Sequence, residues 1–583
     1  MVTRCAGPDL TLGPPAAGRF SLPHMPGLDG IRGLAVLAVL AYHLDLVWAG
    51  GGFLGVEVFF TLSGFLITQL LVGELRSRGR VGLVAFARAR ARRLVPALGA
   101  CVVATALGYR LLLPAEADGL RDDALSSLLY LQNWHLVFEG VPYGADQART
   151  APFLHLWSLA VEVQLYLCWA LLVVVLVGRA RRGTAIRVTL GLAGASAVAM
   201  ALRYSPDGSA DGGSPAYYAT DTRASGFLLG AALALAWTPR EWTAPLQRPV
   251  AAVLDITGFV ALVLLGVELA RDSEFDPALY QQGGFLRIGL LVVALIVAAT
   301  RKGGLLRVVL AGRMLTWVGR RSYGLYIYHW PVFALVRGAP DQGWVPDVVA
   351  LAVTFAVAEV SYRWLETPIR RGWIRAGVQR LGLRRHHVVL GTLWAAVTVV
   401  ALTVAATSPW AATQAQAAPA APAVPTGPAT GHTLVIGDSI AMGATEALRS
   451  ALGPDTTTMA AAVGRQFAAA PPIVVDWAAQ DGGPIVVELG ANGTIQPHDV
   501  DAVVSAAGGR RVVLVGVAVS RRWREGNNTV LRAAAARHAP SVVFVDWAAL
   551  VAGHPGSIGP DRVHPTDQGR LLLSNAILDA LRR

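Results

Sequence analysis

The stretch RGLAVLAVLAYHL, residues 32–44, is apolar enough to lie in lipid, yet it begins with an arginine and carries a histidine beside its last residue. Eleven positions separate Arg32 from His43, which in an α-helix puts both side chains on nearly the same face, about 16 Å apart along the axis. Ionisable side chains inside a membrane span are costly and usually mark function. The stretch therefore predicts a membrane helix with a polar group at each end of one cavity. The alternatives are an arginine that anchors the helix at the interface and a histidine that only packs.

Similar apolar stretches recur along the first two thirds of the chain. Apolar residues make up 54% of the 583, and the mean hydropathy is +0.49, which excludes a single water-soluble globule. Several stretches approach the roughly 20 residues that cross a bilayer as a helix. A shorter, more polar segment at 124–138 predicts an interfacial helix. We predict a polytopic α-helical membrane protein of about ten or eleven helices, at residues 31–48, 53–72, 94–113, 154–177, 188–202, 224–237, 249–269, 284–300, 316–337, 346–362 and 387–407.

Arginines gather in alternate loops of this region, at residues 73–93, 178–187 and 363–386, whereas loop 272–283 holds none. Arginine-rich loops are typically cytoplasmic, so we expect a cytoplasmic N-terminus and, after eleven helices, an extracytoplasmic C-terminus. The net charge of +12 then reflects membrane topology and not nucleic-acid binding. The three cysteines show neither disulfide nor zinc spacing, and we predict no metal site.

The composition changes after residue 407. A segment rich in alanine and proline is typical of a semi-rigid linker. Beyond it, short β-branched runs such as TLVIGDS and PIVVELG alternate with helix-like segments, which predicts a parallel sheet covered by helices, a soluble three-layer α/β/α domain. The predicted parts are an N-terminal tail (1–25), a membrane domain (26–372), a connecting segment with the last membrane helix (373–407), a linker (408–431) and the α/β domain (432–583).

Three further ionisable residues lie in apolar surroundings. They are Glu57 in GGFLGVEVFFTLSGFLIT, Glu162 in HLWSLAVEVQLYL and His329 in SYGLYIYHWP. A lone carboxylate in hydrocarbon costs several kcal/mol, so each should find a partner among packed helices. For Glu57 a structural partnership is as good an interpretation as catalysis, whereas Glu162, seven residues after His155, favours a functional role.

Seven blocks follow one another along this region, and in chain order they are LDGIRGLAVLAVLAYH, GVEVFFTLSGFLIT, FARARARRLVPAL, HLWSLAVEVQLYL, DTRASGFLLGAALAL, SYGLYIYHWP and YRWLETPIRR. With these blocks the membrane region resembles the membrane-bound acyltransferase family 3 over about residues 27–372. The family signature of an arginine, ten residues and a histidine matches Arg32 and His43. The resemblance implies a bacterial plasma-membrane enzyme that moves an acyl group, usually acetyl from acetyl-CoA, onto hydroxyls of extracytoplasmic glycans, lipids or antibiotics.

This resemblance also suggests site residues. Guanidinium groups suit the phosphates of coenzyme A, and Arg32 is expected to hold the donor with the cluster Arg88, Arg90, Arg92 and Arg93. His43 is either a general base or the carrier of the acyl group. One departure concerns the acidic motif: family members often have paired glutamates where this chain has Glu162 followed by Val163, so Glu162 would act alone.

Ser439 follows an apolar strand in VIGDSIAMGA and precedes a helix, where the helix N-terminus supports a developing anion. AVGRQ and LGANG follow later strand-like runs, and DRVHP lies near the C-terminus. With these motifs in this order, the α/β region resembles the SGNH hydrolase superfamily over about residues 432–583. The resemblance implies Ser439 as nucleophile, His564 as its base and Asp561 as the group that orients His564. The oxyanion donors would be the backbone N–H groups of Ser439 and Gly464 and the side-chain amide of Asn492.

Together the two halves predict an O-acyltransferase that takes an acyl group from cytoplasmic acyl-CoA. It would pass the group, directly or through Ser439, to a hydroxyl of a glycan, another envelope component or a secreted metabolite. No bound cofactor is expected, since acyl-CoA is a substrate; the other partners are the acceptor and the bilayer, and nucleic acid is not one. The alternatives are a transporter or flippase, which also has many helices and buried charges, and an extracytoplasmic esterase on a membrane anchor.

Overall fold

The computed structural model describes most of the membrane domain and most of the α/β domain. The predicted tail up to residue 21, the predicted helix 387–407, the linker 408–431 and two predicted site residues, Gly464 and Asp561, lie outside the described residues. The described ranges are 22–44, 46–113, 120–138, 151–204, 214–237, 247–271, 277–301, 303–336, 344–371, 432–462, 465–480, 483–493, 495–519, 523–559 and 563–583.

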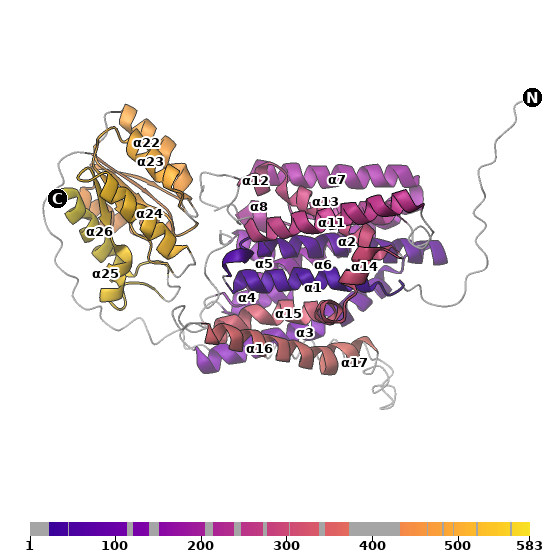
Figure 1. Cartoon of the computed structure of the whole chain (residues 1–583). Helices are drawn as coiled ribbons and strands as arrows, with labels where there is room; N and C mark the ends of the chain where they lie inside the picture. The colour runs from indigo at the N-terminus through magenta and orange to yellow at the C-terminus, as the bar shows by residue number, and fades with distance from the viewer. Residues whose placement is uncertain are drawn as a thin grey trace, which may run out of the picture.

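Ten of the predicted membrane segments form helices that lie side by side in one bundle (Figure 1). Six helical segments in the described part of the chain are long and apolar enough to span a bilayer, and they include α2, α3, α6, α7, α11 and α16. The chain is therefore a multi-pass membrane protein. The ten helices are α1 (Pro26–His43), α2 (Gly55–Arg78), α3 (Leu83–Leu112), α6 (Trp157–Arg179), α7 (Arg182–Arg203), α9 (Ala224–Ala236), α11 (Arg248–Arg271), α13 (Gly284–Thr300), α15 (Arg313–Val336) and α16 (Val345–Val360).

Short helices connect these spans. Where we expected one interfacial helix at 124–138, the structure has two short helices separated at Tyr130, whose backbone is left-handed (φ 57°) and whose carbonyl accepts a hydrogen bond from Gln164. The short elements are η1 (Val47–Ala49), η2 (Gly52–Leu54), α4 (Leu120–Leu128), α5 (Gln132–Phe138), η4 (Leu154–Leu156), α8 (Ser214–Tyr218), α12 (Pro277–Gln281), α14 (Leu305–Leu310), η5 (Ser361–Glu366) and α17 (Thr367–Arg370).

Helices α2 and α9 pack with their backbones in close contact. A Cβ atom on Gly64 would collide with the backbone oxygen of Phe227, and one on Gly230 would collide with that of Thr61. Small residues allow such close approach between membrane helices, where van der Waals packing takes the place of a hydrophobic driving force. The glycines of the LSGFLIT and ASGFLLG motifs therefore hold the centre of the bundle together.

The C-terminal part folds as a five-stranded parallel sheet in the order β2-β1-β3-β4-β5, as the alternation of runs and helices predicts. Two separate hydrophobic clusters lie against the sheet, one including Val435, Leu448 and Leu573 and the other Leu434, Val474 and Leu531. Neighbouring residues of β1 thus face opposite sides, and helices cover both faces. The elements are β1 (Thr433–Gly437), α20 (Ser439–Gly443), α21 (Thr445–Leu452), β2 (Thr457–Ala461), η6 (Phe467–Ala469), α22 (Ala470–Ala479), β3 (Ile485–Glu488), α23 (Pro497–Ala506), β4 (Val512–Val515), α24 (Arg524–Arg537), β5 (Val542–Val545), α25 (Trp547–Gly553) and α26 (Asp567–Arg582).

Candidate active site

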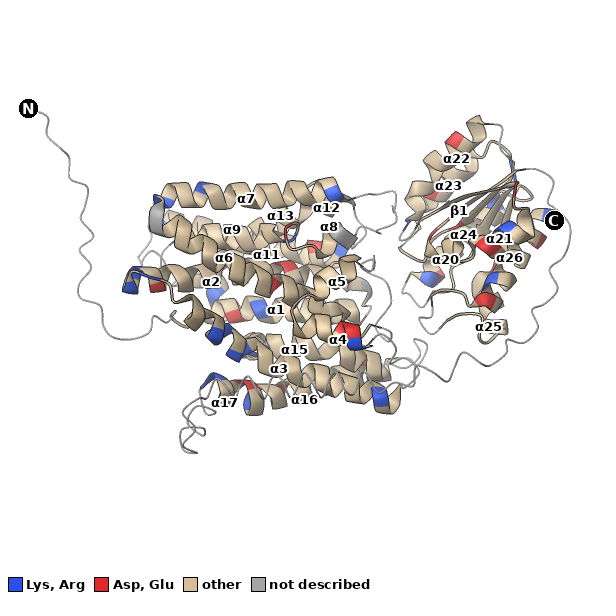
Figure 2. Cartoon of the chain, turned by 180° about the vertical axis from the view of Figure 1, so that it is seen from behind, with Lys and Arg blue, Asp and Glu red and all other residues tan. Residues whose placement is uncertain are grey.

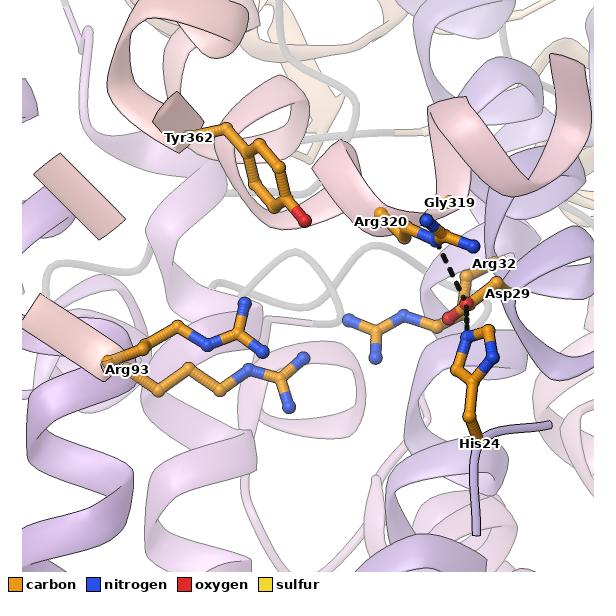
Figure 3. Close-up of a pocket in the computed structure, with 8 residues that line it drawn as sticks. His24, Asp29, Arg32, Arg93, Gly319, Arg320 and Tyr362 are labelled. Carbon is orange, nitrogen blue, oxygen red and sulfur yellow. Dashed lines mark hydrogen bonds and ion pairs between the residues drawn. The ribbon is translucent and has the colours of Figure 1, made fainter. Parts of the chain in front are cut away.

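A basic cavity of about 460 Å³ opens at one end of the membrane bundle, where the N-terminal parts of α1 and α15 meet α3, η5 and α17. In Figure 3 the guanidinium groups of Arg32 and Arg93 extend toward each other from opposite walls, and the hydroxyl of Tyr362 points between them. The residues that line this basic cavity are His24, Asp29, Arg32, Arg93, Gly319, Arg320, Tyr362 and Arg370.

Positive charge exceeds negative charge in the basic cavity. Its carboxylate, Asp29, lies 2.8 Å from His24 Nε2 and 3.6 Å from Arg320 Nε, and Arg32 Nε donates to Ser322 Oγ at 3.3 Å. The described lining thus holds four arginines and one carboxylate. Guanidinium groups that converge in this way form strong, often bidentate hydrogen bonds with phosphate and carboxylate, so the cavity is suited to an anionic ligand.

Only part of the predicted arginine cluster reaches this cavity. Arg93 lines it, whereas Arg88 is exposed; the partly buried Arg90 and Arg92 are also absent from its described lining. Arg90 instead lies over the ring of Phe86, 5.9 Å from its centroid. A helix turns about 100° per residue, so neighbouring arginines of one cluster must point in different directions.

Two arginines of the cavity were not predicted as donor-binding residues. Arg320 lies just before the SYGLYIYHWP motif, and Arg370 lies inside YRWLETPIRR. The sequence could have indicated them, because one lies beside and the other lies within a block that carries the family resemblance. Figure 2 shows that lysine and arginine gather mainly at the end of the bundle that carries α17, so charge used for topology and charge used for binding look alike in the sequence.

A second, smaller cavity of about 50 Å³ continues from Arg32 into the bundle. Glu162 lines it, partly buried, and its carboxylate accepts hydrogen bonds from the hydroxyls of Ser63 and Tyr166. Ser158 and Tyr326 line it as well. Glu162 therefore has hydroxyl partners on its own helix and on α2, and it shares a cavity with Arg32, as a functional role for both would require.

His43 lies at the other end of α1, within a cluster of three histidines. His43 Nδ1 is 3.1 Å from Nε2 of His329, which is fully buried, and the His329 ring is 5.3 Å from that of His155. The sequence indicated His329 as an additional site residue and His155 only as a neighbour of Glu162. The structure instead brings His155, from η4, next to His329 of α15.

The proline of the HWP triplet leaves a carbonyl of α15 available to a histidine of this cluster. Pro331 lies inside α15 and has no N–H to donate to the carbonyl of Ile327, four residues earlier. That carbonyl accepts a hydrogen bond from His155 Nε2 at 3.0 Å and one from Cys101 Sγ at 3.1 Å. The HWP triplet thus supplies both a histidine and a backbone acceptor for a second histidine.

Glu57 has a structural partner. Its carboxylate lies 3.2 Å from a terminal nitrogen of Arg223, and both side chains are almost fully buried. The Arg223 guanidinium lies 4.0 Å from the ring centroid of Phe285 and 4.9 Å from that of Tyr217. Ion pairing and aromatic rings together offset the desolvation of both charges. The structure favours the structural interpretation of Glu57 over catalysis.

In the α/β domain Ser439 and His564 meet at the carboxyl edge of the parallel sheet. Ser439 begins α20, directly after β1, and its Oγ lies 2.9 Å from His564 Nε2. The two residues are 125 positions apart in the sequence. A hydroxyl within hydrogen-bond distance of an imidazole is the arrangement that activates a serine nucleophile.

Asn492 is held by the residue before the serine. Its Nδ2 donates to Asp438 Oδ2 at 2.9 Å, while Asp438 Oδ1 accepts from the backbone N–H of Ile440 at 2.9 Å. An amide nitrogen carries two hydrogens, so Asn492 keeps one for an oxyanion. Among the predicted residues that the structure describes, Ser439, His564 and Asn492 are all brought together.

Behind this site two carboxyl groups share a buried position that the sequence did not reveal. Glu488 ends β3, accepts from the backbone N–H of Ala441 at 3.1 Å and forms a side-chain hydrogen bond with Asp438. Burial raises the pKa of Asp438 to about 6, and burial together with the nearby Asp438 charge raises the pKa of Glu488 well above its usual range. The available signal was an acidic residue that ends an apolar strand in PIVVELG.

Comparisons with known proteins identify the family of the chain. The family model described as "Acyltransferase domain" (acyltransferase family 3) matches residues 25–363, more than half of the chain. The chain belongs to acyltransferase family 3. The peptidoglycan O-acetyltransferase OatA of Listeria monocytogenes is 29% identical over 613 residues, which cover 94% of this chain and 97% of that protein. The O-acetyltransferase OatA of Staphylococcus aureus is 29% identical over 593 residues, covering 96% and 97%.

This acyltransferase family 3 member is accordingly an O-acetyltransferase of the membrane. A solved structure of the C-terminal catalytic domain of Streptococcus pneumoniae peptidoglycan O-acetyltransferase A, with a methylsulfonyl adduct, is similar to part of the chain. It covers 26% of this chain and 93% of that chain, with 25% identity and a TM-score of 0.23.

Proposed function

We propose that this chain moves acetyl groups from acetyl-CoA to hydroxyl groups of the peptidoglycan glycan strands. In this proposal the basic cavity binds the donor on the cytoplasmic side, and the C-terminal domain works outside the membrane. Two relatives that match nearly its whole length are named for O-acetylation, one of them for peptidoglycan, which supports the acceptor class.

The donor site rests on charge and shape. Coenzyme A carries several phosphate groups, and Arg32, Arg93 and Arg370 converge on the basic cavity from three different elements. Arg32 lines both cavities, so an acyl chain attached to a donor held there would extend toward Glu162 and the interior of the bundle. This supports a donor that enters from the arginine-rich end, which the positive-inside rule puts in the cytoplasm.

The second transfer uses the serine of the α/β domain. Ser439 Oγ attacks the carbonyl carbon of the acyl group that arrives from the membrane domain, and its proton passes to His564 Nε2. As the bond to the carrier breaks, His564 gives this proton to the carrier, and an acetyl-serine remains. A glycan hydroxyl then attacks this ester and gives its proton to His564, which passes it to the Ser439 oxygen as the serine is released. The developing oxyanion would be held by Asn492 and the Ser439 backbone N–H.

The single observation that carries the proposal is the 2.9 Å contact between Ser439 and His564 on the same chain as an acyltransferase bundle. The test is mass spectrometry of peptidoglycan fragments from cells that express the chain or its variants. We expect His43→Ala to abolish the acetyl mass increment on glycan fragments and Ser439→Ala to lower it at least tenfold. Ser450→Ala, an exposed serine of α21 in the same domain, is the matched control and should leave the increment unchanged.

Other outcomes would identify the alternatives. An increase in glycan acetylation with Ser439→Ala would make the α/β domain a deacetylase. Unchanged acetylation with His43→Ala, together with loss of export of an envelope component, would support a transporter. Acetylation of lipids or secreted metabolites, with unmodified glycans, would contradict the proposed acceptor.

A further inference from the structure

His329 lies between His43 and a backbone carbonyl. Its Nδ1 is 2.5 Å from the oxygen of Tyr326, and its Nε2 is 3.1 Å from Nδ1 of His43. Three groups are thus joined in a row, an oxygen that only accepts hydrogen bonds and two imidazole rings that can each donate and accept.

The carbonyl decides which nitrogens carry hydrogen. Because the Tyr326 oxygen can only accept, the hydrogen of His329 must be on Nδ1, and a neutral His329 then has its lone pair on Nε2. That lone pair accepts from His43, so the hydrogen of His43 is on Nδ1. The chemical consequence is that the lone pair of His43 is on Nε2.

A doubly protonated His329 would reverse this order, but its surroundings oppose it. The side chain is fully buried, and its described neighbours are the rings of His155, Tyr326 and Phe333. None of these three carries a negative charge at neutral pH that would replace the lost hydration of a cation. The neutral form of His329 therefore fits its position.

The ring of His43 is also held in place. The indole of Trp330 meets it edge to face at 4.6 Å between centroids, and Tyr42 meets it at 5.0 Å. Trp330 adjoins His329 in α15, so one turn of this helix both orients the His43 ring and accepts its hydrogen. Orientation and tautomer are thus set by the same element.

We propose that His329 is a positioning residue that selects the tautomer of His43 and so makes Nε2 of His43 its reactive atom. The inference rests on the proposed role of His43 in acyl transfer. As a base, Nε2 takes the proton of a hydroxyl that attacks the thioester carbon; the carbon–sulfur bond breaks, and the imidazolium returns the proton to the thiolate of coenzyme A. As a carrier, Nε2 itself attacks that carbon, the carbon–sulfur bond breaks, and coenzyme A leaves as its thiolate. Both roles need the lone pair on Nε2.

The test compares two amides at position 329 in the full-length enzyme in lipid nanodiscs, with acetyl-CoA and soluble glycan fragments. The amide of His329→Gln reaches the place of Nε2 and its oxygen accepts from His43. The shorter amide of His329→Asn bonds Tyr326 but does not reach His43. We expect kcat to fall about tenfold in His329→Gln and about a hundredfold in His329→Asn and His329→Leu, with KM for acetyl-CoA unchanged.

His155→Leu is the matched control, because it removes another buried imidazole of the same cluster, whose described hydrogen bond goes to the carbonyl of Ile327. We expect its kcat to fall by less than that of His329→Leu. Equal kcat for the Gln and Asn variants, or an equal loss in His155→Leu, would overturn the inference. Full activity in His43→Ala, or an inactive wild-type enzyme with acetyl-CoA, would instead contradict the proposed function itself.

Discussion

At the scale of single residues, the α/β domain carries a proton that the unfolded chain would release. Asp438 and Glu488 are both buried and joined by a hydrogen bond, and the pKa of each is raised, that of Asp438 to about 6. Between about pH 4 and pH 6 the folded pair binds more protons than the unfolded chain. The stability that the proton on Asp438 contributes is complete below the ordinary pKa range of a carboxyl group, and it is lost as the pH rises through about 6.

This gives a prediction about the pH dependence of stability. In the wild-type protein the free energy of unfolding of the α/β domain should fall as the pH rises from 4 to 7, by on the order of 3 kcal/mol from the raised pKa of Asp438 alone. Glu488→Gln, which keeps an amide donor to Asp438, should reduce this slope. Pulse proteolysis of the full chain, with the fragment of residues 432–583 followed over that pH range, measures both slopes. Parallel slopes for the two proteins would show that the pair does not titrate as described.

At the scale of elements, the face of a helix decides which arginines line the basic cavity that we propose as the donor site. Arg93 and Arg88 belong to the same arginine-rich segment of α3, yet Arg93 lines the basic cavity and Arg88 is exposed. Five residues correspond to about 500° of rotation, which is 140° away from the same face. One cluster of arginines in the sequence is therefore divided between the basic cavity and the exposed surface of α3.

The corresponding prediction concerns donor affinity. Arg93→Ala should raise KM for acetyl-CoA about tenfold or more, because a charge-assisted hydrogen bond to a phosphate is lost, while kcat changes little. Arg88→Ala is the control on the same helix and should keep KM within twofold. Steady-state kinetics of both variants in nanodiscs decide between them. If Arg88→Ala has the larger effect, the donor binds outside the basic cavity.

At the scale of the whole molecule, the proposed reaction needs the basic cavity and the α/β domain to open on opposite sides of the membrane. The basic cavity would face the cytoplasm and the α/β domain the cell exterior, which agrees with the gathering of arginines at one end of the bundle. Two exposed residues can be used to test this topology, Arg88 of α3 and Asp567 of α26.

Single cysteines test this topology in a chain from which the three native cysteines have been removed. A membrane-impermeant maleimide should label Asp567→Cys in intact cells and Arg88→Cys only after the membrane is permeabilised. Labelling of both in intact cells, or of neither, would be incompatible with transfer across the membrane.

The sequence by itself determined the fold classes and indicated most of the candidate site residues. Hydrophobic length alone predicts the spans, since a helix must satisfy its backbone within the membrane, and the alternation of strands and helices predicts the parallel sheet. Arg32, His43, Ser439, Asn492 and His564 are recognisable because motifs keep a functional side chain at a fixed place in a short segment. Each of these side chains stays within its motif, whatever fold the rest of the chain adopts.

Only the tertiary structure decided which distant residues meet. Arg370 reaches the cavity of Arg32, His155 reaches the histidines of α1 and α15, and Glu488 reaches the carboxylate beside Ser439. These contacts depend on how helices pack and on the order of strands in the sheet, and neither leaves a local pattern in the chain. The packing of the fold decides which residue pairs with a buried charge, because desolvation penalises any charged group that packing leaves without a partner.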